Sequence, residues 1–365
     1  MDSNPTQDFV VPNPVIVMGN QKGGVGKTTN SINVAAALGS LGYRVLLIDA
    51  DAEANSTQGL GVSADKHAGI YEVCLGHFPI ERVALTEGMP ENVHLVPSRT
   101  DVTHLHRKMD LSTDEAIFNL LRPHTDRARQ LYDVVLIDSP PGAGTYQAVA
   151  ALAVADFMIF SVKDDSYSFD AMLKAMREMI MPIKEGANPD LEILGVLVSD
   201  VLLQSHDWIR DLYAPMFKQN AHHFMFQRRI RKHGFIKKCQ RLGCTVFQHP
   251  QRGWEKNRGI VEDYQAVAGE IVRRMTDYDD YVDMKMVDES PAFKKTLEKH
   301  LAEIEKGESA AEAAEGEETP QGDPVNGKTG ESDNDEPEAV DVVVTAGLDD
   351  IPTSDSQRSG AVTHA

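Results

Sequence analysis

A glycine-rich stretch near the N-terminus limits what this chain can fold into more than any other feature. It reads Val15-Ile-Val-Met-Gly-Asn-Gln-Lys-Gly-Gly-Val-Gly-Lys-Thr-Thr29, and an apolar helical pattern follows it to about Leu41. The apolar run at its start predicts a buried strand. Strand, glycine loop and helix in this order are the context that a phosphate-binding loop requires. The stretch therefore predicts a nucleotide site on a strand–loop–helix unit, and the alternative is a glycine-rich turn without a ligand.

The residues of this loop have separate predicted tasks. Glycines let the backbone turn tightly, so that successive N–H groups face phosphate oxygens, and the start of the following helix adds positive dipole. Lys27 is expected to reach the β- and γ-phosphates, and the Thr28 hydroxyl is expected to ligate Mg²⁺. The predicted nucleotide-binding residues are Gly23, Gly24, Val25, Gly26, Lys27, Thr28 and Thr29.

The loop departs from the general pattern G-x-x-x-x-G-K-[ST], because Gln21 stands where the first glycine belongs and Lys22 precedes the glycines. The form K-G-G-x-G-K-[ST] resembles the loop of the ParA/MinD group of P-loop ATPases. The resemblance implies ATP and Mg²⁺ as cofactors and hydrolysis of ATP to ADP and phosphate. It also implies a homodimer in the ATP-bound state, in which Lys22 reaches across the interface to the partner's nucleotide.

Two later strands end in carboxylates. Residues 42–51 predict a buried strand that ends at Asp49 and Asp51, and residues 132–138 predict another that ends at Asp138. Strand, helix and strand in succession indicate a parallel sheet, and ligands of such sheets bind beyond the carboxyl ends of the strands. We therefore expect these carboxylates beside the glycine loop, with Asp138 as a Walker B residue that holds Mg²⁺. The alternative for 49–53 is an acidic, solvated turn.

Both segments also resemble the ParA family. Asp49-Ala-Asp51-Ala-Glu53 corresponds to the family's D-x-D-P-Q, and Ser139-Pro-Pro-Gly142 to its D-T-P-P segment. By resemblance, Asp51 orients the attacking water and Asp49 helps to hold the Mg²⁺ shell. Glu53 replaces the family's glutamine and adds charge near the triphosphate. The predicted catalytic residues are Lys22, Lys27 and Asp51, and the predicted metal ligands are Thr28, Asp49 and Asp138.

A basic stretch stands out in a chain whose formal net charge is −20. Residues 228–241 hold seven basic residues and no acid, and they loosely resemble the family's P-R-x-V-R-x-S-E-A segment. Such a row can lie along phosphates and release counterions, which predicts binding to DNA of any sequence. The alternative is a solvated basic face. The predicted DNA-binding residues are Arg228, Arg229, Arg231, Lys232, Lys237, Lys238 and Arg241.

Other elements follow from periodicity and capping. Helices are predicted from Ser112, with a capping box to Glu115, from Ser168, at 208–217 and from Ile260. Met172, Met176 and Met179 recur at a spacing that favours core packing. Further strands are predicted at 92–98, 157–162 and 191–198.

The cysteines and the hydropathy of the chain bear on its cellular compartment, on membrane spans, and on zinc and iron–sulfur sites. Three separated cysteines do not form a disulfide framework, which favours a reducing cytosol, and no apolar run approaches the length of a membrane span. Zinc ligation by His233, Cys239, Cys244 and His249 is the minor alternative to ordinary structural roles, because the spacing is not that of a zinc finger. The two cysteines also lack the C-x-x-C spacing of an iron–sulfur carrier of the Mrp or nitrogenase iron-protein type.

We therefore predict one doubly wound α/β domain with a mostly parallel sheet at residues 14–283. A disordered leader at 1–13 and an acidic, largely disordered tail at 284–365 flank it; residues 307–365 carry 15 acidic and 2 basic residues.

The predicted function is partition of a plasmid or chromosome by a cytoplasmic, nucleoid-associated ATPase. Its ATP-bound dimer binds DNA non-specifically, and a centromere-binding, ParB-like partner stimulates slow hydrolysis. A MinD-like positioning ATPase is the main alternative, but it needs a basic amphipathic C-terminal helix, and the chain ends Arg358-Ser-Gly-Ala-Val-Thr-His-Ala365. A DNA-binding scaffold without ATPase activity is another.

Overall fold

The computed structural model describes residues 9–142, 144–202, 225–248 and 257–276. The predicted acidic tail, most of the predicted leader and the predicted helix at 208–217 lie outside these residues. No helix within the described ranges is long and apolar enough to cross a membrane.

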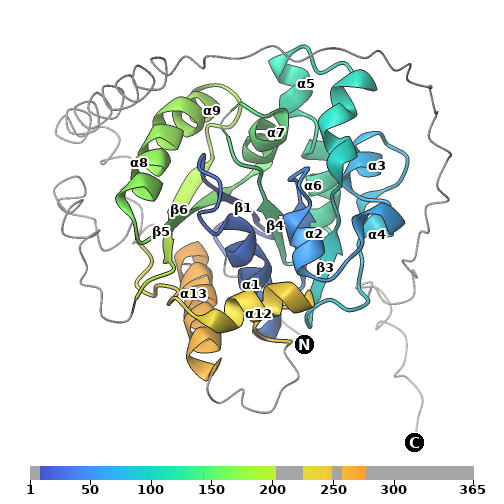
Figure 1. Cartoon of the computed structure of the whole chain (residues 1–365). Coiled ribbons are helices and arrows are strands. Elements are labelled where there is room, and N and C mark those ends of the chain that lie inside the picture. Colours follow the sequence, from blue (N-terminus) through green and yellow to red (C-terminus); the bar gives the residue numbers. More distant parts are fainter. Residues whose placement is uncertain (1–8, 143, 203–224, 249–256, 277–365) are drawn as a thin grey trace, which may run out of the picture.

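A sheet of parallel strands forms the centre of the molecule, and helices cover both of its faces (Figure 1). Its strands are β1 (Val15–Gly19), β2 (Val45–Asp49), β3 (Val93–Val96), β4 (Val134–Asp138), β5 (Phe157–Lys163) and β6 (Glu192–Ser199). They lie in the order β3-β2-β4-β1-β5-β6. Since β1 is central and the chain crosses to either side of it, the sheet is doubly wound, which confirms the predicted fold class.

Side chains alternate between the two faces along each strand, so each face has its own core. On one face Ile16 and Met18 of β1 pack with α1 (Lys27–Ser40) and α13 (Arg258–Thr276), and α12 (Gly234–Leu242) completes this layer. Val15 and Val17 belong to the core of the other face.

The helices that cover the second face come from the middle of the chain. Met172, Met176 and Met179 are all buried in this core, as predicted from their spacing. A π-helical turn, Met176–Ile180, separates α8 from α9. The helices here are α3 (Ile70–Cys74), α4 (Ile80–Val83), α5 (Asp114–Phe118), α6 (Arg122–Arg129), α7 (Tyr146–Val154), α8 (Ser166–Ala175) and α9 (Met181–Glu185).

Three predicted helix starts were wrong by one or two residues. Helix α13 begins at Arg258 instead of Ile260, and two other helices differ at their caps. The cap of α5 is Thr113, whose Oγ1 accepts the N–H of Ala116 at 3.2 Å, and not Ser112. Helix α8 begins at Ser166, where the Asp165 carboxylate caps it, instead of at Ser168. In both cases a neighbouring polar side chain satisfies the free N–H groups of the first turn.

The basic stretch adds to the edge of the sheet. Backbone N–H groups of Phe226 and Ile230 donate to carbonyls of β6 at 3.0 and 2.9 Å, and that of Lys232 donates to Val201 O at 2.7 Å. The chain therefore runs beside β6 before it enters α12, which sequence analysis did not predict. This path brings the basic residues close to the carboxyl ends of the strands.

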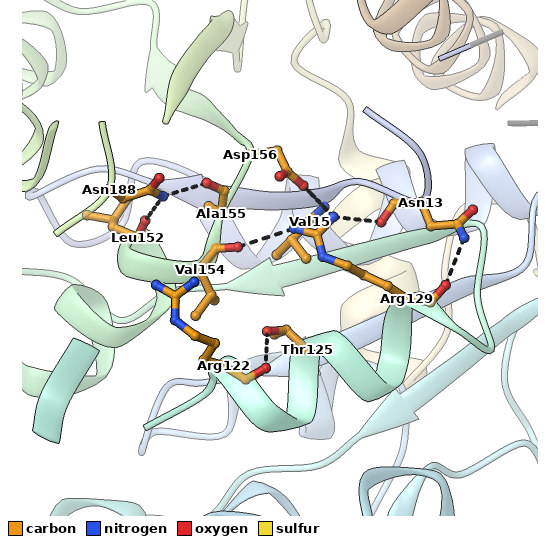
Figure 2. A network of polar contacts seen from close by, with 10 residues as sticks. All are labelled: Asn13, Val15, Arg122, Thr125, Arg129, Leu152, Val154, Ala155, Asp156 and Asn188. Carbon is orange, nitrogen blue, oxygen red and sulfur yellow. Dashed lines mark hydrogen bonds and ion pairs between the residues drawn. The ribbon is translucent and has the colours of Figure 1, made fainter. Parts of the chain in front are cut away.

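A polar network fixes the opposite, N-terminal end of β1 (Figure 2). The Arg129 guanidinium of α6 forms an ion pair with Asp156 at 2.7 Å, and the Asp156 carboxylate accepts the N–H of Val15 at 2.7 Å. Asn13 and Arg129 exchange two further side chain–backbone bonds of 2.8 and 2.9 Å. These contacts anchor the strand that carries the glycine loop at its other end.

Candidate functional site

The glycine loop joins β1 to α1 in a phosphate-binding conformation. Gly24 and Gly26 have φ angles of 72° and 95°, the left-handed region that glycine enters without strain, and Gly26 caps α1. All seven predicted nucleotide-binding residues, 23–29, line a cleft of about 940 Å³. Such a volume suits a nucleotide-sized ligand.

Lys27 is buried at the floor of this cleft. Its Nζ donates to the carbonyl of Lys22 at 3.1 Å. Burial lowers the pKa of Lys27, while the charges of Asp138, Asp51 and Glu53 oppose that shift. The ammonium group therefore lies among carboxylates inside its own loop, where it can exchange the Lys22 carbonyl for phosphate oxygens.

Asp138 lies fully buried at the end of β4, within a ring of hydroxyl groups. Ser31 and Ser56 donate to its two carboxylate oxygens at 2.9 and 2.8 Å, and Thr28 also donates a hydrogen bond to it. Burial raises the pKa of Asp138, and these bonds together with Lys27 oppose the rise. A hydroxyl and a carboxylate in contact are oxygen donors that fit Mg²⁺. Sequence reasoning missed both serines, although Ser31 lies one helical turn after Lys27.

Asp49 lies beside Asp138 in the parallel register of β2 and β4 but faces the following turn. One carboxylate oxygen accepts the Thr57 N–H and hydroxyl at 2.8 and 2.7 Å, and the other accepts the Asp51 N–H at 3.2 Å. Burial raises the pKa of Asp49, and the charge of Asp138 adds to the rise. These contacts make Asp49 the support of the 51–57 turn, and its role in the metal shell stays a prediction.

Asp51 lines the cleft with a side chain that is only 6% exposed. Its Oδ1 accepts the Glu53 N–H at 3.0 Å. Burial raises the pKa of Asp51, as does the charge of Glu53, whereas Lys27 lowers it. The Glu53 carboxylate itself accepts a bond from Asn55 at 2.8 Å on the rim. Asp51 is thus placed at the cleft as predicted.

Lys22 does not line the cleft of its own chain. Its Nζ lies 3.6 Å from the carboxylate of Asp165, which caps α8, and 5.4 Å from the centre of the ring of Tyr167, in the first turn of α8. The Lys22 side chain is 40% exposed and Tyr167 is 75% exposed. The lysine is therefore accessible from solvent.

The predicted DNA-binding residues fall into two groups. Arg228 and Arg231 both bind the buried Asp263 of α13, through contacts of 2.6 to 2.7 Å. Lys232 forms a longer ion pair of 3.7 Å with Asp200. Lys232 is nevertheless exposed, as are Lys237, Lys238 and Arg241 of α12; the remaining residue, Arg229, is half-buried.

Helix α12 forms one wall of the nucleotide cleft. Lys237 and Gln240 line the cleft together with Arg231 and Lys232. The Gln240 amide donates to the Thr29 hydroxyl of the glycine loop at 2.7 Å. A charge pattern carries no signal for this contact, so sequence reasoning did not find Gln240.

The zinc alternative gains no support from the described residues, which hold no group of three or more potential metal ligands. His233 uses its Nδ1 to accept the Phe235 N–H at 3.1 Å at the start of α12. His249, the fourth residue of that hypothesis, lies outside the described ranges.

Comparison with known proteins agrees with the resemblance to the ParA/MinD group that the glycine loop indicated. A family model described as an AAA domain matches residues 13–193. The chromosome partitioning protein ParA of Myxococcus xanthus is 31% identical over 268 residues, 72% of this chain and 89% of that protein. The chromosome-partitioning ATPase Soj of Thermus thermophilus is 35% identical over 237 residues, 64% of this chain and 87% of that protein.

Solved structures share the fold. Cobyrinic acid a,c-diamide synthase from Mycobacterium smegmatis, with bound ADP and magnesium, matches with a TM-score of 0.58 and 22% identity over 73% of this chain and 96% of that one. The cell division ATPase MinD of Pyrococcus furiosus matches with a TM-score of 0.55 and 20% identity over 72% and 99%. The sequence relatives, the glycine loop, and Asp138 with the hydroxyl groups around it all indicate the same family. The chain belongs to the ParA-type ATPases of the ParA/MinD superfamily, P-loop enzymes whose cofactors are ATP and Mg²⁺.

Proposed function

We propose that this protein is a DNA-partition ATPase, whose ATP-bound dimer holds DNA of any sequence and releases it after hydrolysis. The observation that carries the proposal is the position of α12. Its exposed Lys238 and Arg241 lie outside the nucleotide cleft, whereas Lys237 and Gln240 line the cleft and Gln240 bonds to Thr29. A surface suited to phosphodiesters therefore shares a helix with the wall of the ATP site.

In this proposal the loop amides of residues 23–29 and Lys27 hold the triphosphate. Thr28 and Asp138 would hold Mg²⁺, which would supply positive charge to offset that of the triphosphate, and Asp49 supports the neighbouring turn. Asp51 lines the same cleft and orients the water that attacks the γ-phosphate. The rate gain comes from positioning and from charge stabilisation, without a covalent intermediate.

Lys22 completes the site of a second copy. It is exposed, and its contacts with Asp165 and Tyr167 are those of a surface side chain. Release from Asp165 would free the ammonium group for the partner's triphosphate, where a second positive charge offsets charge that develops in the transition state. The dimer is thus tied to the ATP-bound state.

In this proposal, α12 makes most of the contacts with DNA. Arg228 and Arg231 are already neutralised by Asp263, so they hold the segment in shape and have less charge to offer to phosphates. Lys237, Lys238 and Arg241 would release counterions from the duplex, which gives affinity without sequence preference. A ParB-like partner bound at the cargo would then stimulate hydrolysis, in the cytoplasm at the nucleoid.

The test compares nucleotide states. We expect the wild-type protein with Mg²⁺ and a slowly hydrolysed ATP analogue to bind several duplexes of unrelated sequence with similar affinity, and to bind them far more weakly with ADP. Lys27→Ala, which loses the phosphate contact, serves as the matched control and should bind DNA weakly with either nucleotide. Equal binding in the ATP and ADP states would contradict an ATP-switched DNA carrier. Binding to anionic vesicles in place of DNA would favour a MinD-like role.

A further inference from the structure

The last turn of α12 places two cysteines side by side. The N–H of Gly243 donates to Gln240 O at 3.3 Å, and the N–H of Cys244 donates to Cys239 O at 3.1 Å. With Gly243 in the left-handed region at φ 64°, these two bonds form a Schellman motif. In this motif the residue after the glycine meets the residue five positions earlier, and here both are cysteines.

The two thiols lie on the same turn. The Cys244 thiol donates a hydrogen bond to the Cys239 carbonyl oxygen at 3.7 Å, and the nearby Cys244 side chain is one cause of the raised pKa of Cys239. Cys239 is buried, whereas Cys244 is half-buried and can be reached from solvent. A Cβ on Gly243 would lie 2.4 Å from the Gly61 Cα, so the turn fits tightly against its neighbour and keeps the thiols together.

We propose that Cys239 and Cys244 form an oxidisable dithiol site that closes to an intrachain disulfide by exchange with a small disulfide. The Cys244 thiolate attacks one sulfur of that molecule, forms a mixed disulfide and expels a thiolate. The Cys239 thiolate then attacks the Cys244 sulfur and expels the second thiolate. Two protein thiols lose two protons and two electrons, and the small disulfide is reduced to two thiols.

The backbone geometry permits this bond. A disulfide needs Cα atoms within about 4.4 to 6.8 Å of each other, and the motif's hydrogen bond holds the two backbones close together. Burial raises the pKa of both thiols, so exchange at neutral pH is slow. Gln240, which bonds to Thr29, is the next residue after Cys239. The site therefore lies one residue from a contact between α12 and the glycine loop.

The third cysteine is an internal control. Cys74 lies in α3, in the core of the opposite face of the sheet, and burial raises its pKa to about 12. Cys239 and Cys244 both belong to the other face, so Cys74 should stay reduced under the same treatment.

The experiment treats the full-length protein with oxidised glutathione, alkylates the remaining thiols, and measures peptides by mass spectrometry. In the wild type we expect the peptide that spans both cysteines to lose the mass of two hydrogens. Cys239→Ser should instead retain one glutathionyl group on Cys244, because the resolving thiol is gone. Cys244→Ser should stay unmodified. Thermal melting and ATP binding of both variants, compared with the wild type, confirm that they are folded.

A wild type that keeps a stable glutathionyl group on Cys244 would overturn the proposal, because Cys239 would then not resolve the adduct. A wild type that remains fully reduced would also overturn it. Both results come from the unaltered protein, so the proposal stays decidable if the buried Cys239→Ser change prevents folding.

Discussion

At the scale of single residues, the nucleotide site places two carboxylates side by side, and their like charges destabilise the protein when no cation is bound. Asp49 and Asp138 are both fully buried and adjacent, and burial raises the pKa of each. Carboxyls of the unfolded chain ionise near pH 4, so below that pH their contribution to stability is fully present. It is lost as the pH rises through the higher pKa values of the folded state. In the proposed function, this loss of folding free energy is the cost of a site that would hold Mg²⁺.

We therefore predict that Asp138→Asn stabilises the metal-free, nucleotide-free protein by roughly 1 to 3 kcal/mol, because it removes a buried like charge. The gain should grow as the pH rises above about 4. Thermal melting at several pH values in the presence of a chelator measures it. The same variant should lose the stabilisation that Mg²⁺ with ATP gives the wild type. A variant with a lower melting temperature than the wild type at pH 7 would show that the negative charge of Asp138 does not destabilise the folded protein.

Asp51 supplies a second prediction at this scale. Since it lines the cleft but makes few contacts beyond the Glu53 N–H, Asp51→Ala should still bind ATP. Turnover should fall by about a hundredfold or more, as expected on losing the group that orients the nucleophile. Phosphate release under saturating ATP is the measurement. Near-normal turnover would transfer the role to Glu53, which the double variant would then reveal.

At the scale of elements, α13 and the basic stretch depend on each other. Asp263 is 1% exposed, and its charge is offset by Arg228 and Arg231. On the sequence, these two arginines are as good candidates for DNA contact as any in the stretch. The structure gives them a partner more than thirty residues away, and no local pattern could have indicated that pairing.

Replacing Arg231 by alanine should therefore destabilise the fold, because it leaves Asp263 buried with fewer partners. We expect the free energy of unfolding to fall by about 1 to 3 kcal/mol. This is less than the loss on breaking a fully buried ion pair, since Arg231 is itself a quarter exposed. Asp263→Asn combined with Arg231→Ala should recover part of the loss. Denaturant unfolding measures both variants. If Arg231→Ala lowers DNA affinity without any change in unfolding, Arg231 contacts DNA directly.

The glycine loop, Asp51, Asp138 and the strands could be predicted because each signal is contained in a few consecutive residues. Helix α12 could not, since its buried Phe235 and Cys239 are separated by exposed basic residues that were read only as charge. Ser31, Ser56 and Gln240 were missed for a related reason. The fold brings their partners, Asp138 for the two serines and Thr29 for Gln240, from 82 residues or more away in the sequence.

At the scale of the whole molecule, the account requires two copies. Lys22→Ala should bind ATP with little change, because Lys22 is not among the residues that line the cleft of its own chain. It should fail to dimerise with a slowly hydrolysed analogue, since the partner's triphosphate loses a compensating charge. Sedimentation of wild type and variant, each with ATP analogue and with ADP, is the test. A variant that dimerises normally would place Lys22 outside the interface.

The most direct test of the central claim, that α12 carries the DNA surface of an ATP-switched protein, is the salt dependence of duplex binding. Lys238→Glu with Arg241→Glu reverses two exposed charges on α12 that do not line the cleft. Lys66→Glu with Arg107→Glu makes the matched change at exposed positions elsewhere.

We predict that the α12 variant keeps its ATP affinity and loses nearly all duplex binding in the ATP state. The slope of log affinity against log salt should fall by about one unit for each phosphate contact removed, counted over both copies. The control variant should keep most of the affinity and slope of the wild type. An α12 variant that binds DNA with the affinity and salt slope of the wild type would contradict the account.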